Sequence, residues 1–203
     1  MRVQTIIGAG AILLACSTAA DARKIHLFGS HSKTRHAAQP TTVVVRGPQP
    51  IHYQWSLGAS QKAHSDMVAE FRKVGLNPGQ YVWATSVPAE GDTRVVIDRL
   101  TQMFYVYRAG KLVGAAHVST AKQGHITPLG EWKILDKRPF YRSKKYDNAP
   151  MPWMQRIDQY GIALHAGYNP GVPASHGCVR LPNAFAKKLY SVTGVGTPVY
   201  IGA

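Results

Sequence analysis

Cys178 is the residue whose type and surroundings most clearly suggest chemistry. It lies in the run Ser175–Arg180 (SHGCVR), and it is the only cysteine beyond the first 16 residues. A free cysteine is among the most buried residue types, so packing is the alternative role. However, the proline, serine and glycine residues around it are typical of a turn, which can present a thiol beside backbone N–H donors. The pattern therefore predicts a nucleophilic thiol.

A catalytic thiol needs a base that removes and returns its proton, and donors for the oxyanion on the attacked carbonyl. Two histidines follow His125, namely His165 and His176. His165 ends a predicted strand, which can fix its ring, whereas His176 lies in the same turn as the thiol. We therefore expect His165 to be the general base. Because no Asp or Glu follows Asp158, its second ring nitrogen is expected to bond either a backbone carbonyl or an upstream acid such as Asp158.

Two other functions are alternatives to a catalytic thiol: a zinc site and a non-catalytic binding module. His165, His176 and Cys178 are acceptable ligands for a catalytic zinc with a bound water, although a structural zinc would need a fourth ligand. A non-catalytic module could instead bind the cell wall through a basic surface, and such binding would be sensitive to salt and independent of Cys178. That second function does not explain the flanked free thiol, and we expect no metal or other cofactor.

The residues that must position this site lie in a region of predicted strands. From Thr93 onward the apolar residues alternate, which predicts antiparallel strands near residues 95–97, 103–107 and 112–118, with a turn at 108–110. Further predicted elements are strands at 131–135, 161–164 and 198–201 and a helix at 182–190 with proline in its first turn. The fold class is therefore mainly β, in a domain of residues 92–203 that is long enough for one core.

Residues 136–160 interrupt these strands with tyrosine, tryptophan and proline among basic residues. A long aromatic loop near a site often forms a lid or a wall for the substrate. The alternative is a structural excursion whose aromatic side chains only pack.

Three segments precede the predicted domain. Residues 1–22 have the layout of a secretory signal, with Arg2, an apolar stretch at 6–15 and an A-x-A cleavage site at 20–22. The stretch is shorter than the ~20 residues of a membrane-spanning helix, so we expect export to the periplasm or cell envelope. Residues 13–16 (LLAC) also resemble a lipobox, which would leave Cys16 as a lipidated first residue and is our only reason to expect a membrane partner.

The two segments that follow the signal differ in their patterns. Residues 23–50 are basic, lack acidic side chains and predict a flexible linker. Residues 51–91 predict a short helical preface, with a helix at 64–74, Gly75 as its C-cap and a turn at 77–79.

The formal net charge of +14 favours a polyanionic partner. Cell-wall carboxylates, anionic lipid and nucleic acid all fit that charge. The sequence shows no helix-turn-helix pattern, finger ligands or RNA-binding signature, so we expect no nucleic-acid partner. Export makes the cell wall the better candidate.

Three sequence blocks together are similar to the L,D-transpeptidase catalytic domains of bacterial cell walls. They are residues 119–122 (STAK) with 127–132 (TPLGEW), residues 164–167 (LHAG), and residues 175–181 (SHGCVRL). Their order across a β-rich region from about Thr93 to Ile201 makes the resemblance specific. It implies a β-sandwich or barrel-like catalytic domain with one or two short helices.

The resemblance also implies a reaction. Cys178 would attack the peptide bond after the third residue of a peptidoglycan stem, usually diaminopimelate, release D-alanine and form a thioester. His165 would donate and accept the proton, and backbone N–H groups around His176, Gly177 and Cys178 would form the oxyanion hole. The acceptor would be an amine of another stem, giving a three-to-three crosslink, or of a wall-anchored protein or lipoprotein; with water the protein would be an L,D-carboxypeptidase.

Ser175 and Arg180 are the expected substrate-binding residues. Arg180 stands where many members of the family carry asparagine and others arginine. A guanidinium suits a stem carboxylate, because it can make a bidentate, charge-assisted contact. The alternative is an arginine that ties down its own loop.

Overall fold

The computed structural model describes residues 53–202, with side chains from Gly58 onward. The predictions of a signal at residues 1–22, a lipidated Cys16 and a linker at 23–50 lie outside the described residues. All described residues fall within one compact unit. Within this part of the chain, no helix is both long and apolar enough to cross a membrane.

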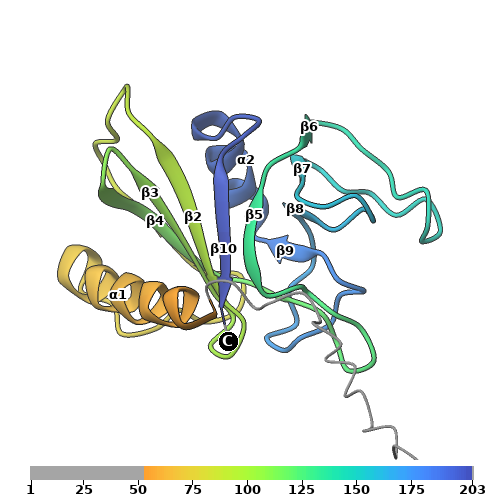
Figure 1. Cartoon of the computed structure of the whole chain (residues 1–203), viewed down its shortest axis with the longest axis horizontal. Coiled ribbons are helices and arrows are strands. Elements are labelled where there is room, and N and C mark those ends of the chain that lie inside the picture. The colour runs from red at the N-terminus through yellow and green to blue at the C-terminus, as the bar shows by residue number, and fades with distance from the viewer. Residues whose placement is uncertain (1–52, 203) are drawn as a thin grey trace, which may run out of the picture. The chain divides into compact units, whose positions relative to one another are not determined.

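The larger of two sheets has six strands in the order β1-β4-β3-β2-β10-β5 (Figure 1). The predicted antiparallel strands are confirmed as β2, β3 and β4, and β10 joins β2 in parallel. The predicted turn between β3 and β4 is also present, with positive φ angles of 49° at Ala109 and 76° at Gly110. The strands are β1 (Tyr81–Trp83), β2 (Thr93–Asp98), β3 (Met103–Arg108), β4 (Lys111–His117), β5 (Gly130–Lys133) and β10 (Pro198–Gly202).

Both faces of this sheet are buried, and alternate residues of its strands enter different cores. Val95 and Ile97 of β2 pack into the main core together with the second sheet and α2 (Asn183–Val192). Val96, between them, packs into a smaller core with Met67 of α1 (Tyr53–Phe71). Side chains of a strand alternate between its two faces, so a continuous apolar run supplies both layers.

Helix α1 covers the outer face of the six-stranded sheet (Figure 1). It is longer at its start than predicted and ends at Phe71, so the prediction that Gly75 caps it was wrong. The chain leaves the helical conformation at Arg72, which has a φ of 55°. The predicted turn at 77–79 is confirmed, because the N–H of Gln80 donates to the carbonyl of Asn77 at 2.9 Å.

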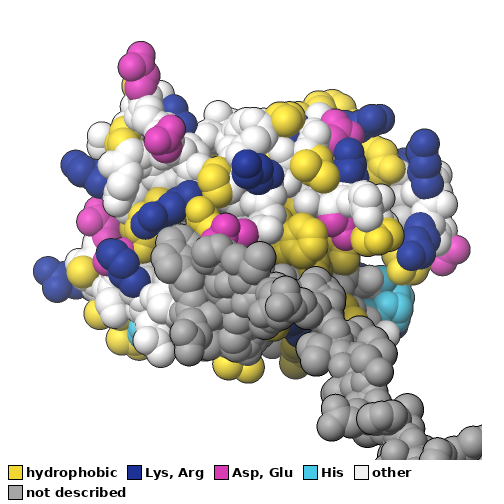
Figure 2. Space-filling view, in the orientation of Figure 1, with side chains coloured by type: hydrophobic (Ala, Val, Ile, Leu, Met, Phe, Trp, Pro, Cys, Tyr) yellow, Lys and Arg dark blue, Asp and Glu magenta, His cyan; other side chains and the backbone are white. Residues whose placement is uncertain are grey.

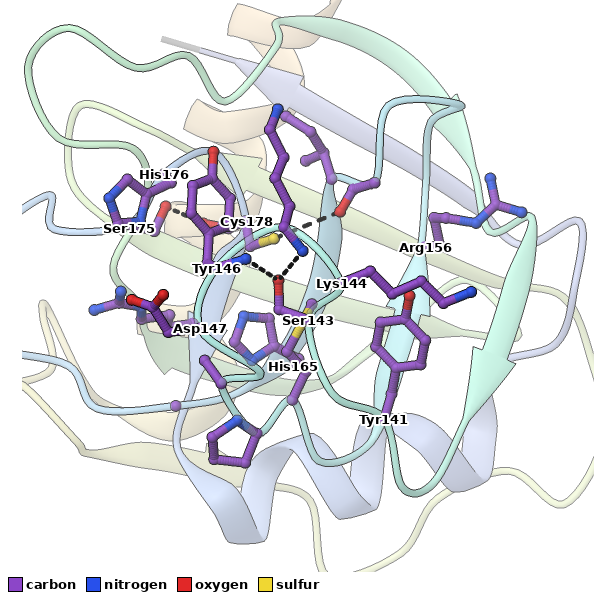
Figure 3. Close-up of a pocket in the computed structure, with 18 of the residues that line it drawn as sticks. Tyr141, Ser143, Lys144, Tyr146, Asp147, Arg156, His165, Ser175, His176 and Cys178 are labelled. Atoms are coloured by element: carbon purple, nitrogen blue, oxygen red, sulfur yellow. Dashed lines mark hydrogen bonds between the residues drawn. The ribbon is translucent and has the colours of Figure 1, made fainter.

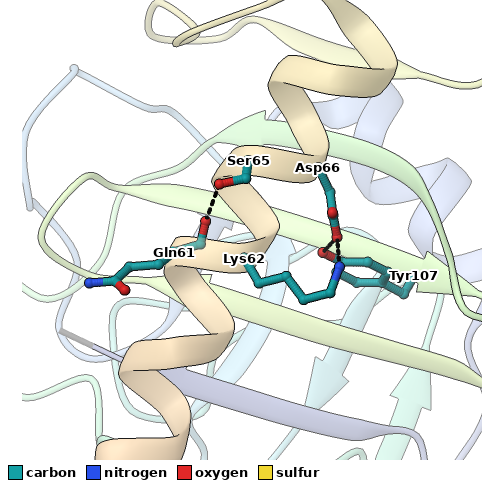
Figure 4. A network of polar contacts seen from close by, with 5 residues as sticks. All are labelled: Gln61, Lys62, Ser65, Asp66 and Tyr107. Carbon is teal, nitrogen blue, oxygen red and sulfur yellow. Dashed lines mark hydrogen bonds and ion pairs between the residues drawn. The ribbon is translucent and has the colours of Figure 1, made fainter.

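A polar contact fixes α1 to β3 (Figure 4). The Asp66 carboxylate accepts from Tyr107 Oη and from Lys62 Nζ, each at 2.6 Å. Burial opposes the ionisation of Asp66, but these two hydrogen bonds together with the charges of Lys62 and Arg94 lower the pKa of the carboxyl. The helix is therefore oriented on the sheet by a charged contact at the edge of its apolar face.

The smaller sheet has four strands in the order β6-β7-β8-β9. The sequence analysis predicted β8 but not β6, β7 or β9, each of which has three residues. Helix α2 packs behind this sheet, and Phe185 fills the space beneath Tyr81, Trp83 and Phe104, with ring centroids 5.5–5.8 Å apart. The strands are β6 (Asp136–Arg138), β7 (Met154–Arg156), β8 (Ala163–Ala166) and β9 (Val179–Leu181).

Candidate active site

The parallel pair β8 and β9 brings the predicted nucleophile and base together. Leu164 lies opposite Val179, and His165 lies opposite Arg180. Leu164 and Val179 point into the main core, so the alternation of a strand directs His165 and Arg180 to the other face. Cys178, the residue before β9, lies on that same face. All three line one pocket of about 720 Å³ (Figure 3).

His165 is buried, with 7% of its surface exposed. Its Nδ1 lies 2.8 Å from the carbonyl oxygen of Ala166, and a carbonyl can only accept, so Nδ1 carries the proton and Nε2 has the lone pair. Burial lowers the pKa of the ring to about 4, although the bond to Ala166 opposes that change. His165 is therefore a neutral base at neutral pH.

Asp158 does not orient this imidazole. Its Oδ1 accepts hydrogen bonds from the N–H groups of Tyr160 and Ile162, at 3.0 and 2.7 Å. The carboxylate thus holds the turn before β8, and the alternative that Asp158 bonds His165 was wrong. The backbone carbonyl of Ala166 accepts the hydrogen bond from the imidazole instead.

Cys178 is half-buried, and its Sγ lies 3.8 Å from the carbonyl oxygen of Gly161. Burial raises the pKa of the thiol, while the N–H of Ala163 and the charge of Arg180 act in the opposite direction. The resting thiol is therefore protonated. Together with a neutral His165, this gives an uncharged pair in which a proton must move when the sulfur attacks.

The turn that carries the thiol, residues 173–178, is held from within by Ser175. The Ser175 hydroxyl donates to the carbonyl of Cys178 at 2.5 Å and accepts from the N–H of Gly177 at 3.0 Å. Gly177 has a φ of 134°, and a Cβ there would lie 2.8 Å from Cδ1 of Ile162. Ser175 and Gly177 thus shape the turn, and binding of substrate by Ser175 stays a prediction.

The first sequence block supports the same turn from outside. The N–H groups of Ala174 and Ser175 both donate to the carbonyl of Thr120 at 3.0 Å, and the N–H of Lys122 donates to the carbonyl of Ser175 at 3.0 Å. Ser119 and Arg180 exchange two backbone hydrogen bonds of 2.9 and 3.1 Å. The block therefore acts as a template for the backbone around the thiol.

Two buried polar residues that sequence reasoning missed complete this template. Thr127 Oγ1 donates to the carbonyl of Gly177 at 2.7 Å and accepts from the N–H of Ala121 at 3.0 Å. Gln102 bonds the backbone N–H of Thr120 at 2.8 Å. Thr127 belongs to a block that carried the family resemblance, so the motif marked it, but only the fold gives its partner.

His176 has a different environment from His165. Its side chain is exposed, stacks on the ring of Tyr146 with centroids 4.4 Å apart, and meets the ring of His125 edge-on at 4.7 Å. Partial desolvation and the nearby charges of Lys122 and His125 lower its pKa. The position favours His165 as the base and places His176 at the rim of the pocket.

Residues 139–152, between β6 and β7, form a segment that we call the wall segment. Most of its residues line the pocket, but Phe140 does not (Figure 3). The segment folds back on itself, because Met151 N–H donates to the carbonyl of Tyr141 and Ser143 N–H to that of Ala149, both at 2.9 Å. Tyr141, Tyr146 and Met151 face the pocket. The aromatic stretch thus lines the pocket, and its role as a wall for the substrate stays a prediction.

The guanidinium of Arg180 forms no hydrogen bond or ion pair with any residue that the structure describes. Its aliphatic stem lies over Gly167, where a Cβ would come within 3.1 Å of Arg180 Cγ. The side chain does not tie down its own loop, and its charge is directed to the pocket. This arrangement suits the contact with a ligand carboxylate that the sequence predicted.

The placement of the histidines does not suit the alternative zinc site. Across residues 53–202, no group of three or more His, Cys, Asp or Glu side chains is arranged to hold a metal ion. His176 stacks on Tyr146 instead of facing the thiol and His165.

Comparison with known proteins identifies the class that this fold and site define. Residues 92–201 match the L,D-transpeptidase catalytic domain family, YkuD, and the chain belongs to that family. The match includes all three sequence blocks, Cys178 and His165. The mainly β fold matches that of a solved L,D-transpeptidase, as the sequence resemblance predicted.

Particular relatives agree. The chain is 30% identical over 131 residues to the Bacillus subtilis protein named "Putative L,D-transpeptidase YqjB", covering 56% of this chain and 73% of that protein. A solved L,D-transpeptidase from Stackebrandtia nassauensis is 31% identical with a TM-score of 0.52, over 59% of each chain. A Mycobacterium tuberculosis L,D-transpeptidase has a TM-score of 0.52 at 20% identity, over 55% of this chain and 57% of that one, and shows the shared fold alone. The chain thus spans less than two thirds of these solved structures.

Proposed function

We propose that this protein is a peptidoglycan L,D-transpeptidase, an acyltransferase that uses Cys178 as its nucleophile. The observation that carries the proposal is the neutral pair of thiol and imidazole on one face of β8 and β9, inside a pocket. The donor is a stem tetrapeptide, and the attacked bond joins its third residue to the terminal D-alanine.

The first half of the reaction forms a thioester. His165 Nε2 takes the proton of the Cys178 thiol as the sulfur attacks the carbonyl carbon of the third stem residue. The tetrahedral intermediate collapses, the C–N bond breaks, and the imidazolium returns its proton to the departing amine of D-alanine. The bond from Nδ1 to the Ala166 carbonyl holds the ring and stabilises the imidazolium between the two steps.

The second half transfers the acyl group. An acceptor amine gives a proton to His165 as its nitrogen attacks the thioester, and the sulfur that departs is protonated again. The acceptor is an amine of a neighbouring stem, which gives a three-to-three crosslink, or of a wall-anchored protein. Water at this step would give L,D-carboxypeptidase activity.

The oxyanion is bound by backbone N–H groups of the turn at 173–178. The N–H of Gly177 already donates to Ser175, so we assign the oxyanion to the N–H groups of His176 and Cys178. Gly177 contributes instead by allowing the backbone conformation that exposes them.

The charge of the pocket suits an acidic donor. Arg180 faces the pocket without a protein partner among the described residues, and most other charged side chains of the lining are also basic. A cationic lining attracts the carboxylates of a stem peptide. The charged lining residues are Lys144, Lys145, Asp147, Arg156 and Arg180.

The proposed reaction takes place outside the cytoplasm, in the periplasm or cell envelope. The signal-like residues 1–22 support export, and the alternative lipobox would attach the protein to the membrane through Cys16. The mass of the mature N-terminus distinguishes cleavage after Ala22 from lipidation at Cys16.

Mass spectrometry of muropeptides tests the reaction. Purified tetrapeptide muropeptides are incubated with the protein, with a Cys178→Ala variant and with a His165→Ala variant. Crosslinked dimers and a thioester adduct on Cys178 are the expected products. Tripeptides alone would assign the carboxypeptidase reaction.

The variants separate the roles of the two residues. Cys178→Ala should abolish turnover, and His165→Ala should slow acylation by at least ~100-fold, as loss of a general base does. Turnover that persists in Cys178→Ala would disprove the thiol mechanism. A large loss in His176→Ala but not in His165→Ala would mean that the base is wrongly assigned.

A further inference from the structure

A row of aromatic rings extends from the wall segment over Trp153, the residue before β7, to α2, and the proposed reaction does not use it. Phe140 and Trp153 have ring centroids 6.3 Å apart, and Trp153 and Tyr190 have centroids 5.6 Å apart. Phe140 is 86% exposed, whereas the other two rings are half-buried. We call these three side chains the aromatic row. An exposed phenylalanine beside two further rings is typical of a binding surface.

The protein holds this row in place. Trp153 Nε1 donates to Asn183 Oδ1 at 3.1 Å, and the Trp153 backbone N–H donates to the carbonyl of Pro139 at 2.9 Å. Lys137 Nζ lies 4.1 Å from the centroid of the Tyr190 ring. Because these contacts fix two of the rings in advance, a ligand that packs on them meets a surface that needs little ordering.

The row borders basic side chains. Lys187 Nζ lies 5.9 Å from the centroid of Trp153, and the Arg138 guanidinium lies 5.6 Å from that of Tyr141. On the side formed by β6, β7 and the wall segment, Figure 2 shows Lys and Arg side chains interspersed with hydrophobic ones. The ligand should therefore offer both a flat apolar face and anionic or polar groups.

The aromatic row begins at Phe140, directly before Tyr141, which lines the pocket. Tyr141 packs with Cys178 around Met151, Met154 and Ala163. Phe140, the preceding residue, is exposed and contacts Trp153 instead. The wall segment thus contacts the surroundings of the thiol through Tyr141 and bears the first ring of the aromatic row at the preceding position.

We propose that the aromatic row binds the glycan strand of peptidoglycan while its stem peptide occupies the pocket. This inference rests on the proposed function. Three stem residues separate the glycan from the attacked carbonyl, and an extended chain of three residues spans only about 10 Å. The glycan must therefore pass close to the pocket, and the row begins one residue from Tyr141.

Sugar chemistry fits this surface. The C–H face of a pyranose ring packs on aromatic rings, and its hydroxyl and N-acetyl groups point outward to polar side chains. Muramyl residues that have lost their stems carry a free carboxylate, which suits Lys187. Because the aromatic rings lie 6.3 and 5.6 Å apart, an extended glycan strand could pack on more than one of them.

Binding of glycan strands from which an amidase has removed the stems tests the inference. The full chain with Cys178→Ala is used, so that no turnover occurs, and it is compared with the same protein carrying Phe140→Ala. Val74→Ala, which truncates another hydrophobic residue with 80% exposure, is the matched control. We expect Phe140→Ala to weaken binding by at least ~5-fold, in the range for loss of an aromatic contact, and Val74→Ala to leave it unchanged.

A second readout links the row to substrate use. With Cys178 intact, Phe140→Ala should slow the reaction with stem-bearing glycan strands and leave the reaction with free tetrapeptide unchanged. Failure of the unaltered protein to use free tetrapeptide would count against the proposed reaction. The binding of stripped strands is measured independently of that result.

Two results would overturn the inference. The first is equal binding of the stem-free strands by the Cys178→Ala protein with and without Phe140→Ala. The second is a loss of binding to anionic lipid vesicles in Phe140→Ala without a loss for glycan strands, which would assign the row to a membrane surface.

Discussion

Replacement of Thr127 by valine tests the idea that a buried hydroxyl holds the catalytic turn. Thr127 is fully buried, and its Oγ1 joins the N–H of Ala121 to the carbonyl of Gly177. Valine keeps the shape of the side chain but removes both hydrogen bonds. The two backbone groups would then be buried without partners.

The size of the effect follows from those two groups. A buried donor or acceptor that loses its partner costs about 1–3 kcal/mol, so the free energy of unfolding should fall by about 2–4 kcal/mol in Thr127→Val after partial relaxation. Thr127→Ser keeps the hydroxyl and loses one methyl group, for which about 1 kcal/mol is expected. Because Gly177 precedes the nucleophile, kcat/KM should also fall more in the valine variant than in the serine variant.

Urea unfolding and steady-state acylation of a tetrapeptide measure both effects. The reasoning requires the valine variant to be clearly less stable than the serine variant. If the two variants have the same free energy of unfolding, the hydroxyl does not hold the turn, and the template described for it is wrong.

Four further predictions concern the site and its supports. Because the pKa of His165 is about 4, the acidic limb of the pH profile of kcat/KM should lie near pH 4, and a limb near pH 6.5 would contradict a buried neutral base. The same lowered pKa stabilises the folded state above about pH 6.5, and this stability is lost as the pH falls towards 4. His165→Gln should therefore flatten that part of the curve of unfolding free energy against pH. Gly177→Ala should destabilise the fold by about 1–3 kcal/mol and lower activity, because residue 177 has a φ of 134° and an added Cβ would meet Ile162. An unchanged melting temperature would show instead that the turn adapts. Lys137→Met should lower the free energy of unfolding by about 1–3 kcal/mol, because Lys137 Nζ donates to the carbonyls of Tyr190 and Thr193 at the end of α2. Thermal unfolding measures this effect, and an unchanged stability would contradict it.

The strands of the larger sheet were predictable because they are marked by apolar runs. In β2 and β3 alternate residues enter two cores, so both faces carry apolar side chains and each strand stands out as a run of β-branched and aromatic residues. Strands β6, β7 and β9 have three residues each, which is too short for alternation to be distinguished from chance. They form because β8 offers a partner and because the wall segment brings β6 and β7 together.

The helix before the domain shows the same limit at its end. The apolar spacing predicted that a helix exists, but it placed the end at Val74, with Gly75 as the cap, rather than at Phe71. Glycine is the usual residue at a left-handed C-cap, yet here Arg72 adopts that conformation. Packing of Met67 and the contact of Asp66 with Tyr107 determine how much of the segment is helical on the sheet.

The sequence by itself determined the family, the mainly β class and the residue types of the site. A lone thiol, a histidine at the end of a strand and a glycine beside the nucleophile are local features, and their spacing is written in the chain. Only the tertiary structure decided which groups hold them. The register of β8 and β9 puts His165 and Cys178 on one face, Ala166 rather than Asp158 bonds the imidazole, and Thr127 reaches Gly177. Such partners depend on which strands pair and which polar groups become buried together, because a hydrogen bond between residues distant in sequence has no local pattern to reveal it.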